Sequence, residues 1–287
     1  MKNRTIAHIL KSEKIDMGGT QVKQPLPTMR VDQIDPFLLL HHFGPTEVEA
    51  GHDPLGVGPH PHRGFEPVTF LYSGGIRHKD SRGNEGILAG GDVQWMTSGM
   101  GIIHSEMASR EFLENGGVME GIQLWVNLPR KDKMVQPRYQ DIKAREIPVI
   151  SEQHGRVQIA VVAGHFRDQQ GPAQTYTPIL ALKVALQKDG KTTIAIPENF
   201  NAMAYILSGQ VQTESGFDYG GETLLHFKND EAGITQSATE DTLVLVLAGK
   251  PIDDPVAQWG PYVMNTQTEI MQAMRDYQMG KMGFYVD

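Results

Sequence analysis

Short apolar runs separated by glycine or proline dominate the chain. Stretches such as PVTFLYSGG, RVQIAVVAG and TLVLVLAG are rich in Val, Ile, Leu, Phe and Tyr, and each ends at or near a glycine. Runs of this length, bounded by Gly or Pro, are typical of strands in a β-sandwich or β-barrel. Helical periodicity is nearly absent before the C-terminal region. The pattern therefore predicts an all-β protein.

One helix is expected close to the C-terminus. Thr266 and Glu269 have the spacing of a capping box, and Gly280 is placed to end the helix as its C′ residue. The apolar residues between them recur at helical spacing: Ile270, Ala273, Met274 and Tyr277. This stripe predicts a helix that covers one sheet.

Two segments far apart in the chain resemble each other. VTFLYSGGIRH and MAYILSGQVQT both run from an apolar strand through a Ser-Gly turn into a second strand. A charged region with two prolines, residues 131–156, separates the halves that contain them. We therefore expect two β domains, residues 1–145 and 146–287, with a boundary placed to within about ten residues.

Composition narrows the chemistry. Of the 287 residues 39% are hydrophobic and 21% charged, as in a protein with a real core, and none is Cys. Disulfides and thiolate metal sites are therefore excluded, and a metal would need His, Asp or Glu ligands. The net charge of −8 argues against nucleic-acid binding. No stretch reads as a signal peptide or membrane span, so we expect a cytoplasmic protein without a membrane partner.

Two strand-spaced pairs suggest a metal site. His60 and His62 lie in PHPHRGFE, and His104 and Glu106 lie in GMGIIHSEM. Alternate residues of a strand share a face, so each pair can present both side chains to one point. Either pair alone is typical of a solvated turn or strand end. Together, in one β domain, they favour three imidazoles and a carboxylate around iron, manganese, nickel, copper or zinc.

Two neighbours of the histidines add to this picture. Pro61 cannot donate to a strand ladder, which predicts an edge strand or the start of a strand for the first pair. Glu66 returns to the face of the histidines if the strand stays regular.

Longer motifs carry a family resemblance. PHPHRGFEPVTFLYSGG, HKDSRGNEG, GDVQWMTSGMGIIHSE, GIQLWVNLP and GPYVMNT, within a match from LLLHHFG to GKMGF, resemble the pirin family of the cupin superfamily. The resemblance implies two tandem cupin barrels with a short C-terminal helix. It also implies a single metal, expected to be Fe(II), held in the first barrel by His60, His62, His104 and Glu106. The second half has no HxH pair, so its barrel is expected to be metal-free.

The resemblance also implies two functions of different class. Some pirins are similar to quercetin 2,3-dioxygenases, which open a flavonol with O₂ and release carbon monoxide. A base is then needed at the metal, with Glu106 or Glu66 as the catalytic candidates. Alternatively, the chain resembles iron-dependent redox-sensing regulators that bind a protein partner without catalysis.

Apolar residues near the ligands are candidates for the substrate pocket, although each is more typical of a core: Phe43, Phe65, Trp95, Met96 and Met107. Trp95 and Trp125 fall in strand-like runs, and we expect both to serve packing.

Overall fold

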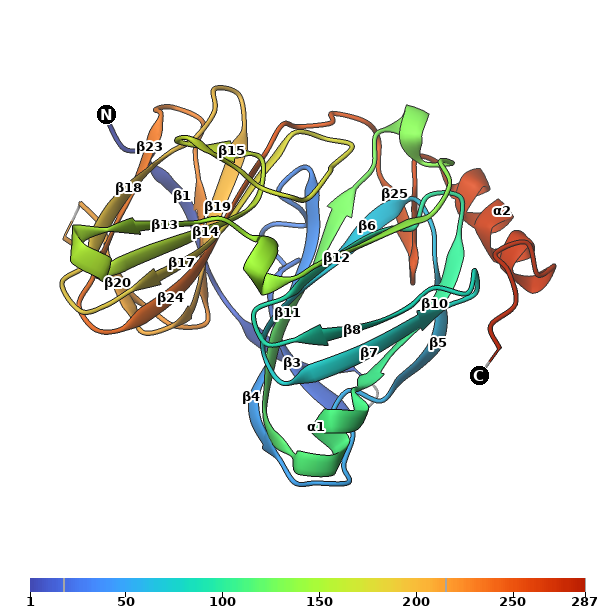
Figure 1. Cartoon of the computed structure of the whole chain (residues 1–287). Helices are drawn as coiled ribbons and strands as arrows, with labels where there is room; N and C mark the ends of the chain where they lie inside the picture. The colour runs from blue at the N-terminus through green and yellow to red at the C-terminus, as the bar shows by residue number, and fades with distance from the viewer. Residues whose placement is uncertain (18, 215, 287) are drawn as a thin grey trace. The chain divides into compact units, whose positions relative to one another are not determined.

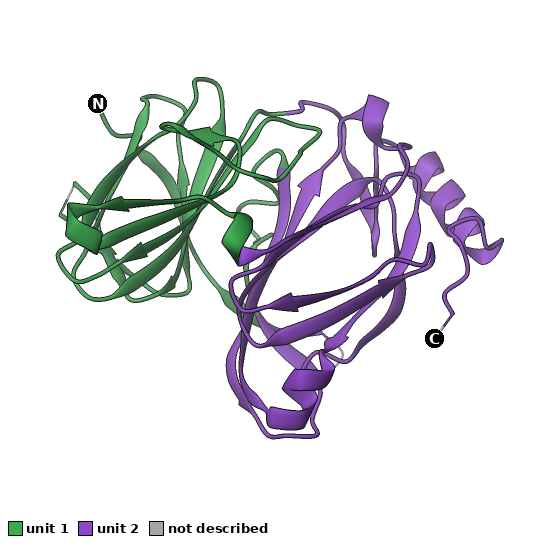
Figure 2. Ribbon diagram, viewed as in Figure 1, with its two compact units in different colours: residues 1–14, 23–36, 145–251 green, residues 15–22, 37–144, 252–287 purple. Residues whose placement is uncertain are grey.

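The computed structural model describes residues 1–17, 19–214 and 216–286. Its contacts divide the chain into two compact units (Figure 2). Unit 2, here called the first barrel, comprises residues 15–22, 37–144 and 252–287. Unit 1, the second barrel, comprises residues 1–14, 23–36 and 145–251.

The first barrel pairs a seven-stranded sheet with a four-stranded sheet. The larger sheet has the order β12-β9-β6-β11-β4-β3-β2, and the smaller β5-β10-β7-β8 (Figure 1). The strands are β2 (Glu13–Met17), β3 (Thr20–Leu26), β4 (Phe37–Val48), β5 (Val57–His62), β6 (Phe65–Ser73), β7 (Gly75–Asp80), β8 (Glu85–Ala89), β9 (Val93–Thr97), β10 (Ile102–Ala108), β11 (Gly117–Asn127) and β12 (Arg138–Ile142).

The second barrel has the same plan. Its larger sheet runs β1-β22-β19-β24-β17-β14-β13 and its smaller sheet β18-β23-β20-β21. The strands are β1 (Ile6–Lys11), β13 (Val149–Glu152), β14 (Val157–Ala163), β17 (Ile179–Leu186), β18 (Lys191–Ala195), β19 (Asn201–Ser208), β20 (Gln210–Gln212), β21 (Asp218–Gly220), β22 (Thr223–Phe227), β23 (Gly233–Ala238) and β24 (Thr242–Gly249). Two short hairpins complete the chain: β15 (His165–Phe166) with β16 (Gln169–Gln170), and β25 (Ala257–Trp259) with β26 (Tyr262–Met264).

The predicted duplication has a structural basis. The two similar segments form β6–β7 and β19–β20, and each leads from the large sheet of its barrel into the small one. Placing β6 on β19 maps both sheet orders onto each other strand by strand. In that mapping β12 of the first barrel corresponds to β1, so the start of the chain supplies an edge strand of the second barrel. The two units therefore alternate along the sequence: residues 1–14 belong with residues 145–251, and residues 252–287 belong with residues 37–144.

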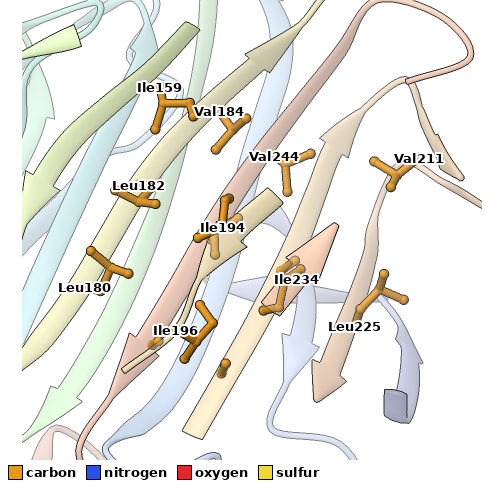
Figure 3. Packing of buried hydrophobic residues seen from close by; sticks show 14 of the residues in the cluster. Ile159, Leu180, Leu182, Val184, Ile194, Ile196, Val211, Leu225, Ile234 and Val244 are labelled. Carbon is orange, nitrogen blue, oxygen red and sulfur yellow. The ribbon is translucent and has the colours of Figure 1, made fainter. Parts of the chain in front are cut away.

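Aliphatic side chains fill the second barrel. Residues from both of its sheets form one cluster that includes Leu182, Ile194, Val211 and Val244 (Figure 3). In the first barrel, Leu71, Ile76 and Leu88 from the two sheets share a smaller cluster. The apolar runs predicted to be strands therefore pack as two layers in each barrel.

Two α-helices occur in the part of the chain that the structure describes. The short α1 (Arg110–Asn115) was not expected. The Ser109 side chain caps its N-terminus, and Phe112 is its buried residue. The predicted C-terminal helix is α2 (Gln267–Gln278), with Thr266 as its N-cap. Gly280 follows with φ of +72°, as its predicted role requires. Neither of these helices is long and apolar enough to span a membrane.

The buried face of α2 differs from the predicted stripe. Ile270 and Ala273 are buried as expected, but Met274 and Tyr277 are 38% and 39% exposed. Asp276 is buried in their place because it binds the guanidinium of Arg63. A hydrophobic pattern cannot anticipate an acid that is buried by a partner from a distant segment.

Candidate metal centre

Two paired strands place the three histidines. β5 is an edge strand, as Pro61 predicted, and it pairs with β10 so that His104 lies directly opposite His60. His62, two residues after His60, shares its face because side chains alternate along a strand. The predicted constellation of three imidazoles is thus brought together by one antiparallel ladder.

The three rings converge on one point. The Nε2 atoms of His60 and His62 are 3.0 Å apart. The ring centroid of His104 lies 4.4 Å from that of His60 and 4.9 Å from that of His62. One nitrogen of each ring lies within 4.8 Å of the others. His60 Nδ1 is 2.9 Å from the carbonyl oxygen of Gly58, to which it can donate. That bond leaves the Nε2 lone pair of His60 for a metal.

Burial keeps two of these imidazoles neutral. The pKa values of His62 and His104 are held well below the usual value, chiefly by desolvation and further by the other histidines. Neutral imidazole is the form that binds a metal. The electrostatics of the site therefore favour coordination over protonation.

The donor set fits a transition-metal ion. Neither ring nitrogen of His104 has a hydrogen-bond partner among the residues that the structure describes, although the side chain is 1% exposed. Buried polar atoms without partners are rare in folded proteins, so these nitrogens call for a ligand. Imidazole nitrogens suit zinc, copper, iron and nickel. The group His60, His62 and His104 could hold such an ion.

Glu106 lies beside this group but has other partners. A register shift separates it from His104 in the pairing with β5. Its Oε1 accepts from, or lies next to, the Thr69 hydroxyl at 3.0 Å, and that hydroxyl is also 2.8 Å from Gln123 Oε1. The single proton of Thr69 can serve only one of them. Glu106 is therefore held toward the opposite sheet, and its carboxylate does not belong to the group of potential ligand atoms that His60, His62 and His104 form among the described residues.

Glu66 lies on another face. A turn at Arg63 and Gly64 ends β5, so the alternation of His60 and His62 does not continue into β6. On β6 the neighbour Phe65 contacts the ring of His62, and Glu66 points to the opposite side, where its Oε1 accepts a 2.7 Å hydrogen bond from Thr97. Burial raises the pKa of Glu66 to about 7, against the opposing effects of Thr97 and Trp95.

The turn after His62 is fixed by the C-terminal segment. Arg63, 3% exposed, binds Asp276 of α2 at 2.9 Å and the Met100 carbonyl at 2.7 Å. The buried ammonium of Lys133 donates to the carbonyls of Gly64 and Val263. A Cβ at Gly64 would lie 2.0 Å from the Val263 oxygen, so this close approach requires glycine.

Several neighbours of the site were not foreseen. Trp125, expected only to pack, lies edge-on to His62, with the two ring centroids 5.6 Å apart. His78 is the cross-strand partner of Glu106, and it binds Asp141 and stacks on Tyr139. No spacing in the sequence links β7 to β12. A histidine within a strand-like run, as His78 is, was a signal that could have been used.

The predicted pocket residues separate into different environments. Phe65 touches His62, whereas Trp95 shares the face of Glu66. Phe43 belongs to the apolar cluster of the first barrel, and Met96 is fully buried. Met107 is 42% exposed.

The duplicated strands show what stands at the ligand positions of the second barrel. Ser73-Gly74 corresponds to Ser208-Gly209, which places Ile76 on Val211; these pair with Ala108 and Ala238. Counting back from those alanines along β10 and β23 places Gln236 at the position of Glu106 and Ile234 at that of His104. The strands paired with them then place Ile194 at the position of His60 and Ile196 at that of His62. The three isoleucines belong to the aliphatic core (Figure 3).

Comparisons with known proteins agree with this architecture. The family model described as Pirin matches residues 19–126, and the one described as Pirin C-terminal cupin domain matches residues 181–283. Pirin-1 of Arabidopsis thaliana is 39% identical over 284 residues, covering 97% of this chain and 94% of the relative. Pirin of Rattus norvegicus is 35% identical over 283 residues, covering 96% and 92%.

A solved structure is similar over almost the whole chain. The crystal structure of quercetin 2,3-dioxygenase from Acinetobacter baumannii is 37% identical, with a TM-score of 0.93. The match covers 98% of this chain and 99% of that one. The fold is therefore two tandem cupin barrels with a C-terminal helix, and the chain belongs to the pirin family.

Proposed function

We propose that the protein is a metal-dependent dioxygenase that opens a flavonol such as quercetin with O₂. The observation that carries the proposal is the convergence of His60, His62 and His104 on one point inside the first barrel. The likeness to a quercetin 2,3-dioxygenase of known structure supports the substrate class. Fe(II) is the proposed metal, with Mn, Ni, Cu and Zn as alternatives that suit the same donors.

The metal, when bound, supplies Lewis acidity and open coordination positions for a substrate oxygen and O₂. His60, His62 and His104 are its proposed ligands, and Glu106 is the proposed fourth. Glu106 shares the face of His104 on β10, and as a ligand its carboxylate would have to leave Thr69 and turn toward the histidines.

Glu106 is also the proposed base for the flavonol hydroxyl. It lies on the inner face, next to the ligands, where a substrate oxygen would sit. A carboxylate that is both ligand and base must leave the metal to accept the proton, and the position beside Thr69 is one in which Glu106 would be free of the metal. Glu66, the second candidate, faces away from the histidines and is assigned to supporting the strand beside them.

The test is anaerobic loading with Fe(II), followed by quercetin and O₂. We expect flavonol consumption with release of carbon monoxide, and its loss in His104→Ala. Turnover no faster than that of free iron, or equal turnover in His104→Ala, would contradict the proposal. Metal binding without turnover would instead favour the redox-sensing regulator if a protein partner also bound this protein in only one oxidation state of its iron.

A further inference from the structure

A group of polar side chains lies beside Glu106 and has no part in the function proposed above. His78 on β7 is the cross-strand partner of Glu106 and is 1% exposed. Its Nε2 is 3.0 Å from Asp141 Oδ2, and Gln94 lies 3.3 Å from the other oxygen of that carboxylate. Although burial alone would raise it, these two partners hold the pKa of Asp141 below its usual value. An ionised Asp141 thus fixes the ring of His78 as a donor through Nε2.

Tyr139 is held by that ring. Its phenol stacks on His78 with the planes 9° apart and the centroids 4.8 Å apart. β12 pairs with β9 so that Tyr139 faces Met96, which is 1% exposed. The tyrosine ring is therefore clamped on the inner face of the first barrel, in a fixed orientation.

The hydroxyl of Tyr139 has nothing to bind within the described residues. It is shielded from solvent and makes no hydrogen bond with any of them. A buried hydroxyl without a partner is unfavourable, so such groups in folded proteins usually bind water or a ligand. A rigid ring that presents an unpaired donor next to a metal-binding group resembles a recognition element.

The charge around Tyr139 keeps its proton in place. Burial raises the pKa of this phenol, and the carboxylates of Asp80, Glu106 and Asp141 raise it further. The hydroxyl is therefore a neutral donor, which suits a carbonyl or partly anionic oxygen. The geometric link to the proposed ligands runs through His78, on which Tyr139 stacks and which lies directly opposite Glu106.

We infer that the Tyr139 hydroxyl donates a hydrogen bond to the carbonyl oxygen of an aromatic hydroxy-ketone whose neighbouring hydroxyl oxygen is directed to the histidine group. The inference rests on the proposed function and narrows its substrate class. A flavonol carries a hydroxyl and a carbonyl on adjacent carbons, so one oxygen faces His60, His62 and His104 and the other faces Tyr139. A catechol has no carbonyl, and both of its adjacent oxygens can be directed to the histidine group, which leaves none for Tyr139. Tyr139 would thus select hydroxy-ketones over catechols.

The test compares two probes on one sample of metal-loaded protein. Under argon, 3-hydroxychromone and catechol are titrated by their absorption changes into the wild type, Tyr139→Phe and Tyr219→Phe. Tyr219 packs against the core of the second barrel and serves as the matched control. We expect Tyr139→Phe to weaken the binding of 3-hydroxychromone about 3- to 10-fold, the contribution of one neutral hydrogen bond, and to leave the dissociation constant of catechol unchanged.

The ratio of the two dissociation constants does not depend on the fraction of protein that folds or retains metal. An unchanged ratio in Tyr139→Phe overturns the inference, as does a wild type that fails to bind hydroxychromone. Quercetin turnover is measured in parallel. If the wild type shows none but the ratio shifts, the recognition role of Tyr139 stands and the dioxygenase proposal fails.

Discussion

At the scale of single residues, burial decides the protonation of Glu66. Its pKa is raised from 4.5 to about 7 because the side chain is removed from water. Between these two values the folded protein holds a proton that the unfolded chain has released. The contribution of Glu66 to stability is therefore largest below about pH 4.5 and is lost as the pH rises to about 7.

The first prediction follows from this shift. Glu66→Gln, which resembles the protonated acid, should be similar to the wild type at pH 5 and more stable at pH 8, by up to about 3 kcal/mol. Urea unfolding at both pH values measures the difference, and comparing the two proteins cancels the titration of the histidines. A constant difference across the pH range would show that Glu66 is ionised in the folded state.

Glu106 has a different expected behaviour. Glu106→Gln keeps the shape of the side chain and the contact with Thr69 but removes the base. We expect flavonol turnover to fall about 100-fold or more, in line with general-base catalysis. Steady-state kinetics on samples with equal metal content check this, and Glu66→Gln serves as the control. Equal losses in both variants would mean that neither acid has a special role as the base.

At the scale of elements, α2 secures the turn that follows the proposed ligand His62. Arg63 and Asp276 form a pair that is almost fully buried, and the pKa of Asp276 is held at about 2, against desolvation, by Lys281 and Arg63. Removing one partner of a buried pair leaves the other charge uncompensated. The pair therefore links the end of the chain to the metal centre.

Asp276→Ala is expected to destabilise the protein by about 3 kcal/mol and to weaken metal binding, because the turn after His62 loses its anchor. The exposed pair of Arg110 and Glu114 offers a matched control, since Arg110→Ala should change stability by less than about 1 kcal/mol. Chemical unfolding and metal titration measure both effects. Unchanged metal affinity in a destabilised Asp276→Ala would separate the anchor from the site.

The same elements show what sequence can and cannot predict. The strands, the capped helix and the His60, His62 and His104 group followed from local spacing and family motifs. The face on which Glu66 lies could not be predicted in this way, because a turn at Gly64 interrupts the alternation of side chains between His62 and Glu66. Nor could the stack of His78 on Tyr139, which depends on two strands that local patterns cannot place together.

At the scale of the whole molecule, two barrels of the same strand order have different interiors. Where the first has His60, His62 and His104, the second has Ile194, Ile196 and Ile234 in a continuous apolar core. Gln236 takes the place of Glu106; it is 1% exposed, and neither of its amide atoms has a partner among the described residues. The equivalent position in the second barrel is therefore polar although its surroundings are aliphatic.

This difference predicts one metal ion per chain, held by the first barrel alone. Protein loaded under argon with excess Fe(II) and then desalted should retain about one equivalent, counting one three-histidine group. His60→Ala with His104→Ala should retain almost none, because a single imidazole remains. Gln236→Ala should retain as much as the wild type and gain stability if the unpaired amide is a net cost. Elemental analysis of the three proteins gives the stoichiometry. A second equivalent that survives in the double histidine variant would place metal in the second barrel and contradict the prediction.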